Sequence, residues 1–312
     1  MIEAGLVASR FLHFATVMAL FGLALFPLYT YPSRVGEPPA QLGRWLRVWL
    51  RLAALLALMS GIAWGLFTVA SMTGALIDTA DRDALWSILR ETGFGQVWVA
   101  RLALMVALLA LMAGRMGSER HPDWITPLVS AMILVSLAGV GHTQADDGTA
   151  GVFHISADGA HLLAAGAWFG GLLSLGYLLT LARGSPSPQH AADASAALVR
   201  FSGMGYIAVA VLVGSGLINA WFLVGSVAKL PTTPYGQLLL AKLCLLAGML
   251  LLAMWNRFWL VPSLVKEKQS DQPAASLWRL RKHVLAEQVL GLLIVLIVSF
   301  MGTMLPALGS SQ

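Results

Sequence analysis

The chain has 312 residues, of which 58% are hydrophobic and only 11% are charged. Because soluble domains carry roughly 25% charged residues, this composition excludes a single water-soluble core and indicates a protein of the lipid bilayer. The formal net charge of +5 does not indicate a nucleic-acid partner, since the basic residues of membrane proteins collect in cytoplasmic loops. The single cysteine, Cys244, excludes a disulfide framework and a CxxC metal or redox motif.

Eight stretches are apolar enough, and long enough, to cross a hydrocarbon layer roughly 30 Å thick. In chain order they are residues 5–30, 47–70, 95–115, 124–142, 154–181, 199–224, 235–259 and 284–304. The first stretch lacks the basic start of a signal peptide, so we expect it to remain as a spanning helix. The connections are short and rich in turn residues, as in YPSRVGEPPAQ and RGSPSPQH. The sequence therefore predicts an all-α polytopic membrane protein, with residues 1–312 in a single membrane domain.

Lysine and arginine are distributed unequally between the two sets of loops. Together with their flanking residues, the loops after the first, third, fifth and seventh stretches hold fourteen lysines and arginines. The opposite side holds six. Since positive residues are retained on the cytoplasmic side of a membrane, we expect both termini to lie outside. The acidic loop GHTQADDG would lie on the same outer side.

The two halves of the chain share an ordered set of residues. The first and fifth stretches read His13-FATVMALFG and His161-LLAAGAWFG. The third and seventh both open with Gly-Gln, followed by Arg101 or Lys242, and the second and sixth share Ser-Gly ahead of a tryptophan. The match between the fourth and eighth stretches is weak. Because a unit of four spans returns the chain to the same side, we expect two parallel repeats, residues 5–142 and 154–304.

The segment FHISADGAH opens the fifth stretch with three polar side chains, His154, Asp158 and His161. On a helix these positions are i, i+4 and i+7, which lie on one face. At 1.5 Å of rise per residue the two histidines are about 10 Å apart, too far for both to bind one ion comfortably. They therefore mark two levels, with Asp158 placed to strengthen a metal-binding nitrogen of either one.

These two levels predict a funnel from the outer face into the membrane. The inner level would pair His161 with its repeat equivalent, His13. The outer level would hold His142, His154, and Asp146 or Asp147 from the loop between them. Intramembrane histidines are usually functional, although each of these could instead form only a hydrogen bond between helices.

Imidazole and carboxylate suit copper, zinc, nickel or iron, and divalent copper binds such sites most tightly. Met301 and Met304 could extend the path for monovalent copper, but methionine is also an ordinary filler of apolar cores. Arg101 and Lys242 lie about one and a half helical turns inside the outer surface. They either extend toward that surface or pair with a carboxylate such as Asp158. A fixed positive charge beside a cation site would weaken binding and favour release.

Several motifs occur in order along the chain: Arg10-x-x-His13, Gly-His142, His154-x6-His161-LLAAGAWFGGL, Arg200-Phe-Ser, Tyr235-Gly-x5-Lys242 and Asn256-Arg257. Together they resemble the copper resistance D family of bacterial inner-membrane proteins, over nearly the whole chain. The resemblance implies copper handling at the inner membrane, usually uptake from the periplasm, where both termini would lie. It also implies a periplasmic copper-binding partner of the CopC type, which would here be a separate protein.

Three functions are compatible with these residues. The leading interpretation is a copper-binding permease, not an enzyme, that accepts copper at the outer histidines and passes it inward through His161 and His13. The second is a haem b-binding redox protein, with one haem between His13 and His161. The third is a scaffold in copper homeostasis whose histidines only tie helices together. No ATP-binding loop or aspartyl-phosphate motif occurs in the chain, so we do not expect a primary pump, and the sequence does not indicate another energy source.

Overall fold

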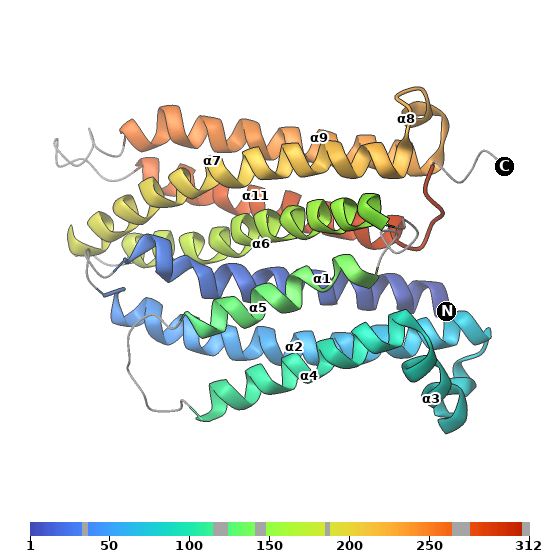
Figure 1. The fold of residues 1–312 in the computed structure, drawn as a ribbon. Coiled ribbons are helices and arrows are strands. Elements are labelled where there is room, and N and C mark those ends of the chain that lie inside the picture. The colour runs from blue at the N-terminus through green and yellow to red at the C-terminus, as the bar shows by residue number, and fades with distance from the viewer. Residues whose placement is uncertain (33–36, 115–123, 141–147, 185–187, 264–274, 308–312) are drawn as a thin grey trace.

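A computed structural model of the protein describes residues 1–32, 37–114, 124–140, 148–184, 188–263 and 275–307. Within these ranges the chain forms helices joined by turns and loops, without a strand. The long helices run side by side in one bundle, and the first helix begins at the end of the bundle where the last helix finishes (Figure 1).

Seven of the described helices are long and apolar enough to cross a membrane. Their bounds are α1 (Ile2–Thr30), α2 (Ala40–Thr73), α4 (Gly93–Gly114), α6 (Gly148–Gly184), α7 (Pro188–Val224), α9 (Pro234–Trp255) and α11 (Ala275–Met301). A π-helical turn, η4 (Asn256–Leu260), continues α9. Short helices connect the long ones at the end where α1 begins: η1 (Leu76–Ala80), α3 (Arg82–Glu91) and α8 (Lys229–Thr232).

The fourth predicted stretch is the exception to this pattern. It forms the shorter helix α5 (Ile125–Val135), followed by a single 3-10 turn, η2 (Ala138–Val140). The prediction of an all-α polytopic membrane protein is confirmed, and the count of eight spans is approximate because α5 is too short to be grouped with the other seven.

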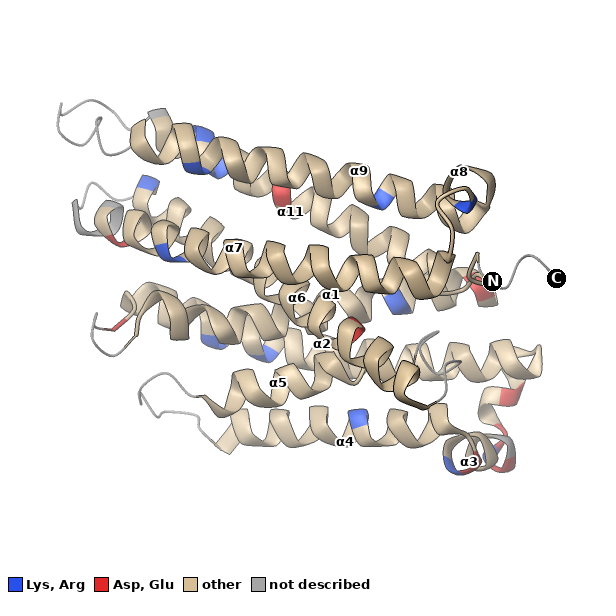
Figure 2. Ribbon diagram, turned by 45° about the horizontal axis from the view of Figure 1, so that its top comes forward, with Lys and Arg blue, Asp and Glu red and all other residues tan. Residues whose placement is uncertain are grey.

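The outer surface of the bundle is apolar, as contact with lipid requires. The helices α7 and α9 expose large side chains such as Ile207, Leu217, Trp221 and Leu251, an arrangement that soluble proteins avoid. Charged side chains gather toward the two ends of the bundle, and few lie between them (Figure 2). Those few are unusual because a charge in the hydrocarbon layer is costly and is normally functional.

At the centre of the bundle, α1 and α6 cross at glycine. A Cβ added at Gly22 would collide with the backbone of Gly166 and Gly170, and one added at Gly170 would collide with the backbone of Gly22 and Ala19. Small residues permit this close approach of helices in membranes. Because the atoms in contact are backbone, no side chain can move aside to accept a larger residue.

We therefore expect Gly170→Val to separate α1 from α6 and to destabilise the protein by about 1–3 kcal/mol, as overpacking of a tight core does. Thermal unfolding in detergent, followed by tryptophan fluorescence, measures the effect. The matched control is Gly214→Val on α7, where an added Cβ meets open space. Equal melting temperatures for the two variants would contradict the close crossing.

Candidate functional site

His13 lies on α1 and is hydrogen-bonded at both ring nitrogens. Its Nδ1 is 3.0 Å from the carbonyl oxygen of Ala57 and 3.1 Å from Ser60 Oγ. Its Nε2 is 2.6 Å from Nη2 of Arg101. Because a guanidinium group can only donate, Nε2 is the acceptor and Nδ1 carries the ring proton. The side chain is 0% exposed, so neither nitrogen is available to a ligand in this arrangement.

Arg101 ties this histidine to two further elements. Its Nη1 donates to the carbonyl oxygen of Ile133 at 2.9 Å and to Ser136 Oγ at 2.6 Å. The Ile133 carbonyl is accessible because the amide of Leu137 bonds to Leu134 instead, as α5 tightens at its end. Arg101 is 1% exposed. It therefore joins α4, α1 and α5 instead of extending to the membrane surface.

Two tryptophan rings fill the space around His13. The ring centroids of Trp64 and Trp98 lie 5.5 and 5.9 Å from that of His13 and 4.8 Å from each other. The Arg10 guanidinium lies over the Trp64 ring at 4.8 Å, a favourable cation–π contact. The first half of the chain thus surrounds its histidine with packed aromatic side chains.

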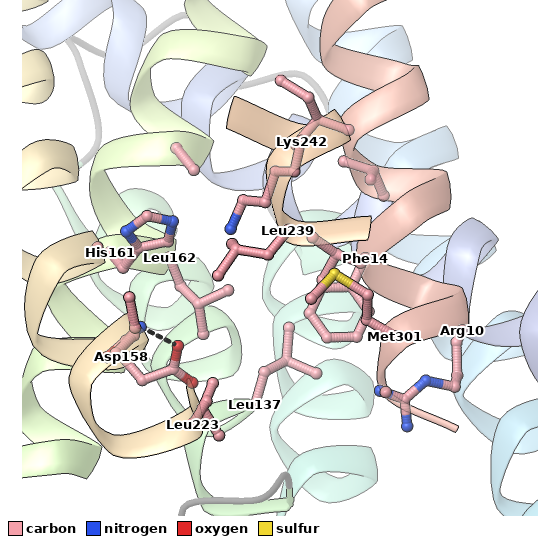
Figure 3. Close-up of a pocket in the computed structure, with 18 of the residues that line it drawn as sticks. Arg10, Phe14, Leu137, Asp158, His161, Leu162, Leu223, Leu239, Lys242 and Met301 are labelled. Atoms are coloured by element: carbon pink, nitrogen blue, oxygen red, sulfur yellow. Dashed lines mark hydrogen bonds between the residues drawn. The ribbon is translucent and has the colours of Figure 1, made fainter. Parts of the chain in front are cut away.

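A cavity of about 210 Å³ lies beside the histidines of the second half, between α6, α7, α9, α11 and α1 of the first half. Its polar lining comes from Arg10, His154, Asp158, His161, Asn219, Tyr235 and Lys242, and its sulfur atoms from Met18 and Met301. The Lys242 amine points toward His161 from the opposite wall, with Asp158 beside them (Figure 3). The structure therefore brings His154, Asp158, His161, Lys242 and Met301 to one cavity, whereas His13, the predicted inner-level partner of His161, does not line it.

The tautomer of His161 follows from its hydrogen bond. Ser215 Oγ donates its proton to the carbonyl oxygen of Val211 at 2.5 Å, so it accepts from His161 Nδ1, which lies 3.0 Å away. The ring proton is then on Nδ1, and the Nε2 lone pair is left for a ligand. A histidine held in this way by a hydrogen bond on one nitrogen is prepared to bind a metal with the other.

Asp158 and Asn219 form the second polar pair of the cavity. Asn219 Nδ2 donates to Asp158 Oδ1 at 3.0 Å, and both His154 and Lys242 interact electrostatically with the carboxyl group. The Oδ1 atom of Asn219 is buried and has no hydrogen-bond partner in the described part of the chain. Such an atom is costly unless something binds it, so it is a further acceptor for a cation or a donor group. The His154 ring is buried and stacked on Phe222, with centroids 4.4 Å apart.

The remaining predicted site residues lie elsewhere. Met304 packs beside the cavity, in an apolar cluster with Met301 and Tyr235. His142, Asp146 and Asp147 lie outside the described residues. Within the described ranges, no group of three or more His, Cys, Asp or Glu side chains is placed to hold a metal ion. A metal in the cavity would therefore need mixed ligands, with Asn219 or Met301 beside the histidines and Asp158.

Matching positions in the two halves explain why only one of them is open. In both halves a histidine is hydrogen-bonded to a serine: His13 to Ser60, and His161 to Ser215. The residue three positions before the histidine is Arg10 in the first half and Asp158 in the second. The residue four positions after the serine is Trp64 in the first half and Asn219 in the second. Each of these pairs is in contact, as Arg10 with Trp64 and Asp158 with Asn219.

The third matched position lies three residues before the buried cation. Trp98 holds this position ahead of Arg101, and Leu239 holds it ahead of Lys242. Asparagine and leucine therefore replace two tryptophans, and the cavity occupies the space that the two indole rings fill in the first half. Neither Asn219 nor Leu239 is among the site residues predicted from the sequence. The only available signal for Asn219 was an amide within an apolar helix, four residues after the shared Ser-Gly.

The fold defines a polytopic membrane protein with an internal cavity lined by histidine and carboxylate side chains. Residues 1–152 match the family model described as copper resistance protein D-like, N-terminal domain, and residues 195–301 match that of copper resistance protein D. The chain belongs to the copper resistance protein D family. It is therefore a multi-pass inner-membrane protein of copper handling.

Three characterised proteins are similar along most of the chain. Inner membrane protein YebZ of Escherichia coli (strain K12) is 32% identical over 304 residues, 96% of this chain and 98% of that protein. Copper resistance protein D of Pseudomonas syringae pv. tomato is 29% identical over 96% of both. Copper transport protein CutJ of Bacillus subtilis (strain 168) is 28% identical over 80% of this chain and 45% of that protein. No solved structure matches the chain.

The different environments of the two histidines predict different effects on stability. His13→Ala removes the acceptor of a buried guanidinium and should cost about 2–3 kcal/mol, since hydrogen bonds to charged groups contribute about that much. His161→Ala, in a half-open cavity, should cost less. Thermal unfolding of the two variants in detergent makes the comparison. A larger loss for His161→Ala would be inconsistent with the described hydrogen bonds.

Proposed function

We propose that this protein binds copper in the second-half cavity and moves it into or across the inner membrane. Copper would arrive at the periplasmic side, where both termini would lie, from a separate CopC-like copper-binding protein. The observation that carries the proposal is the cavity itself, because it gathers imidazole, carboxylate and thioether groups inside the membrane domain of a copper-resistance family member.

The path would have the two levels predicted from the helical spacing. His154 and Met301 would form the entrance, together with His142, Asp146 or Asp147 from the neighbouring loop. His161 would hold copper about 10 Å deeper, through its Nε2, with Asp158 supplying negative charge. Nitrogen and oxygen ligands suit divalent copper and thioether suits monovalent copper, so this lining can accept either state. Lys242 would weaken the binding through charge repulsion and so favour release.

We place the resting copper site at His161 and not at its repeat equivalent. His13 would become a ligand only after Arg101 releases its Nε2, which would leave a buried cation without its acceptor. The same bond argues against a haem between His13 and His161, because iron would need the Nε2 atoms of both rings. The proposed pair of parallel repeats is supported by the matched His–Ser hydrogen bonds of the two halves.

Copper binding by purified variants tests this assignment. We expect His161→Ala and Asp158→Asn to lose most of the tightly bound copper, and His154→Ala to slow its uptake. His13→Ala should keep the wild-type ratio of copper to protein if it remains folded. The ratio is measured by atomic absorption after free metal is removed, together with copper accumulation in cells. Unchanged ratios in all variants would support the scaffold, and a stoichiometric Soret band would support haem.

A second test uses a substitution that fills the cavity and leaves every proposed ligand unchanged. Leu239→Trp places an indole ring where Trp98 lies in the first half, so it should fill the space beside His161 and abolish copper binding. The matched control is Leu243→Trp, one helical turn later on α9, where the leucine is 46% exposed on the outer surface. Equal copper binding by the two variants would show that copper does not occupy this cavity.

A further inference from the structure

A second buried polar site lies deeper in the membrane domain than the cavity. Glu287 on α11 is 2% exposed and stands seven residues before Ile294, which lines the cavity. On α6, Trp168 hydrogen-bonds the Glu287 carboxyl group and stands seven residues after His161. Seven residues correspond to about 10 Å along a helix. The Glu287 site therefore lies about two turns beyond the proposed copper site, on two helices that the sites share.

The Glu287 carboxyl group accepts hydrogen bonds from two neutral side chains. Asn256 Nδ2 donates to Glu287 Oε1 at 2.8 Å, and the Trp168 indole donates to the same group. The amide of Asn256 then accepts from Nδ1 of His283 at 2.7 Å through its own oxygen. A chain of hydrogen bonds thus runs from the buried carboxyl group to a half-buried histidine one turn earlier on α11.

The backbone is unusual where Asn256 joins this chain. Asn256 begins the π-helical turn η4, in which the amide of Val261 bonds to the carbonyl of Asn256, five residues earlier. Turns of this kind are rare and occur frequently at functional sites. Here the turn carries the one side chain that bridges Glu287 and His283, an observation independent of the buried acid.

Few charged groups face this site. The elements packed against α11 are α1, α6, α9 and η4. The titratable or charged side chains that they and α11 carry near this level are Tyr29 on α1, Arg257 on η4, and Lys282 and His283 on α11. The helix α6 carries none within one and a half turns of Trp168, and α9 none within three turns of Asn256. In the described residues, no cation is paired with Glu287.

A carboxylate in the hydrocarbon layer that is bonded only to neutral donors is costly, and a bound cation removes that cost. We propose that Glu287 binds a proton, and that binding of copper in the cavity releases this proton to the aqueous phase at the His283 end. The reaction is the conversion of the neutral carboxylic acid into a carboxylate and an aqueous proton. Because the positive charge of copper about 10 Å away stabilises the carboxylate relative to the neutral acid in a medium of low dielectric, copper and proton would occupy the two sites in alternation.

The proton site can be tested without any assumption about copper. Infrared spectroscopy of the purified protein resolves the C=O stretch of a protonated carboxylic acid from the bands of a carboxylate. We expect a protonated band that Glu287→Gln removes, that Asp158→Asn leaves, and that Trp168→Phe shifts by removing one hydrogen-bond donor. The Trp168→Phe shift keeps the test decisive if Glu287→Gln does not fold. A spectrum in which neither change affects the band would overturn the proposal.

The coupling to copper rests on the proposed function and needs a second measurement. Proton release on addition of copper is recorded in weakly buffered detergent solution. Histidine and carboxylate ligands also release protons when metal binds, so the informative quantity is the difference between variants. We expect Glu287→Gln to release about one proton fewer per bound copper ion than the wild type, and Glu287→Asp to restore that release.

The possible failures of the two proposals are distinguishable. If the wild type binds no copper, the proposed function fails, and the infrared band alone decides the proton site. If copper binds and Glu287→Gln releases as many protons as the wild type, the copper site stands and the coupling is overturned. A third outcome uses the Asp158→Asn variant, in which the cavity has lost its tightly bound copper. If adding copper to this variant still removes the infrared band of Glu287, copper occupies the Glu287 site directly, and the proton assignment is overturned.

Discussion

The hydrocarbon layer provides no water to hydrogen-bond polar groups, so every polar side chain within the bundle must find its partner in the protein or in a ligand. The first half of this protein meets the requirement at both ring nitrogens of His13. Arg101 also donates through Nη1 to Ile133 and Ser136, and its Nε has no hydrogen-bond partner in the described part of the chain. The second half meets it only in part, because Asn219 Oδ1 remains without a partner within the described residues. Asn219 lines the cavity, whereas Arg101 is enclosed and only 1% exposed. The second half is therefore the place where a ligand could reach a buried polar atom that lacks a partner.

Side-chain volume explains how two similar arrangements reach different outcomes. The histidine–serine bond is the same in both halves, and it holds each imidazole against the following helix. In the first half the rings of Trp64 and Trp98 close the surrounding space, and the guanidinium reaches His13 directly. In the second half Asn219 and Leu239 leave a cavity, and the narrower side chain of Lys242 lines it. A small number of differences at matched positions therefore separates a packed core from an open cavity.

The sequence predicted the membrane architecture well, because long apolar runs have few other uses. Helical periodicity also placed His154, Asp158 and His161 on one face, and that face lines the cavity. The sequence could not show which of the two histidines is enclosed, since this depends on the neighbours of His13 across four helices. The sequence also could not show that α5 would be short. The end of α5 tightens where Arg101 donates a hydrogen bond to the carbonyl oxygen of Ile133, a residue distant in sequence. The orientation of the termini and the repeat boundaries remain predictions.

The helices α6 and α11 connect the two polar sites of the second half. On α6, His161 faces the cavity and Trp168 bonds Glu287, and on α11 Glu287 and the cavity-lining Ile294 are likewise seven residues apart. Since i and i+7 lie on one helical face, both helices present the same face to both sites. Gly291 of α11, between these two levels, packs closely against Phe169 of α6. A shift of one helix against the other would therefore alter both sites together, which provides a structural route between metal in the cavity and the state of the buried carboxyl group.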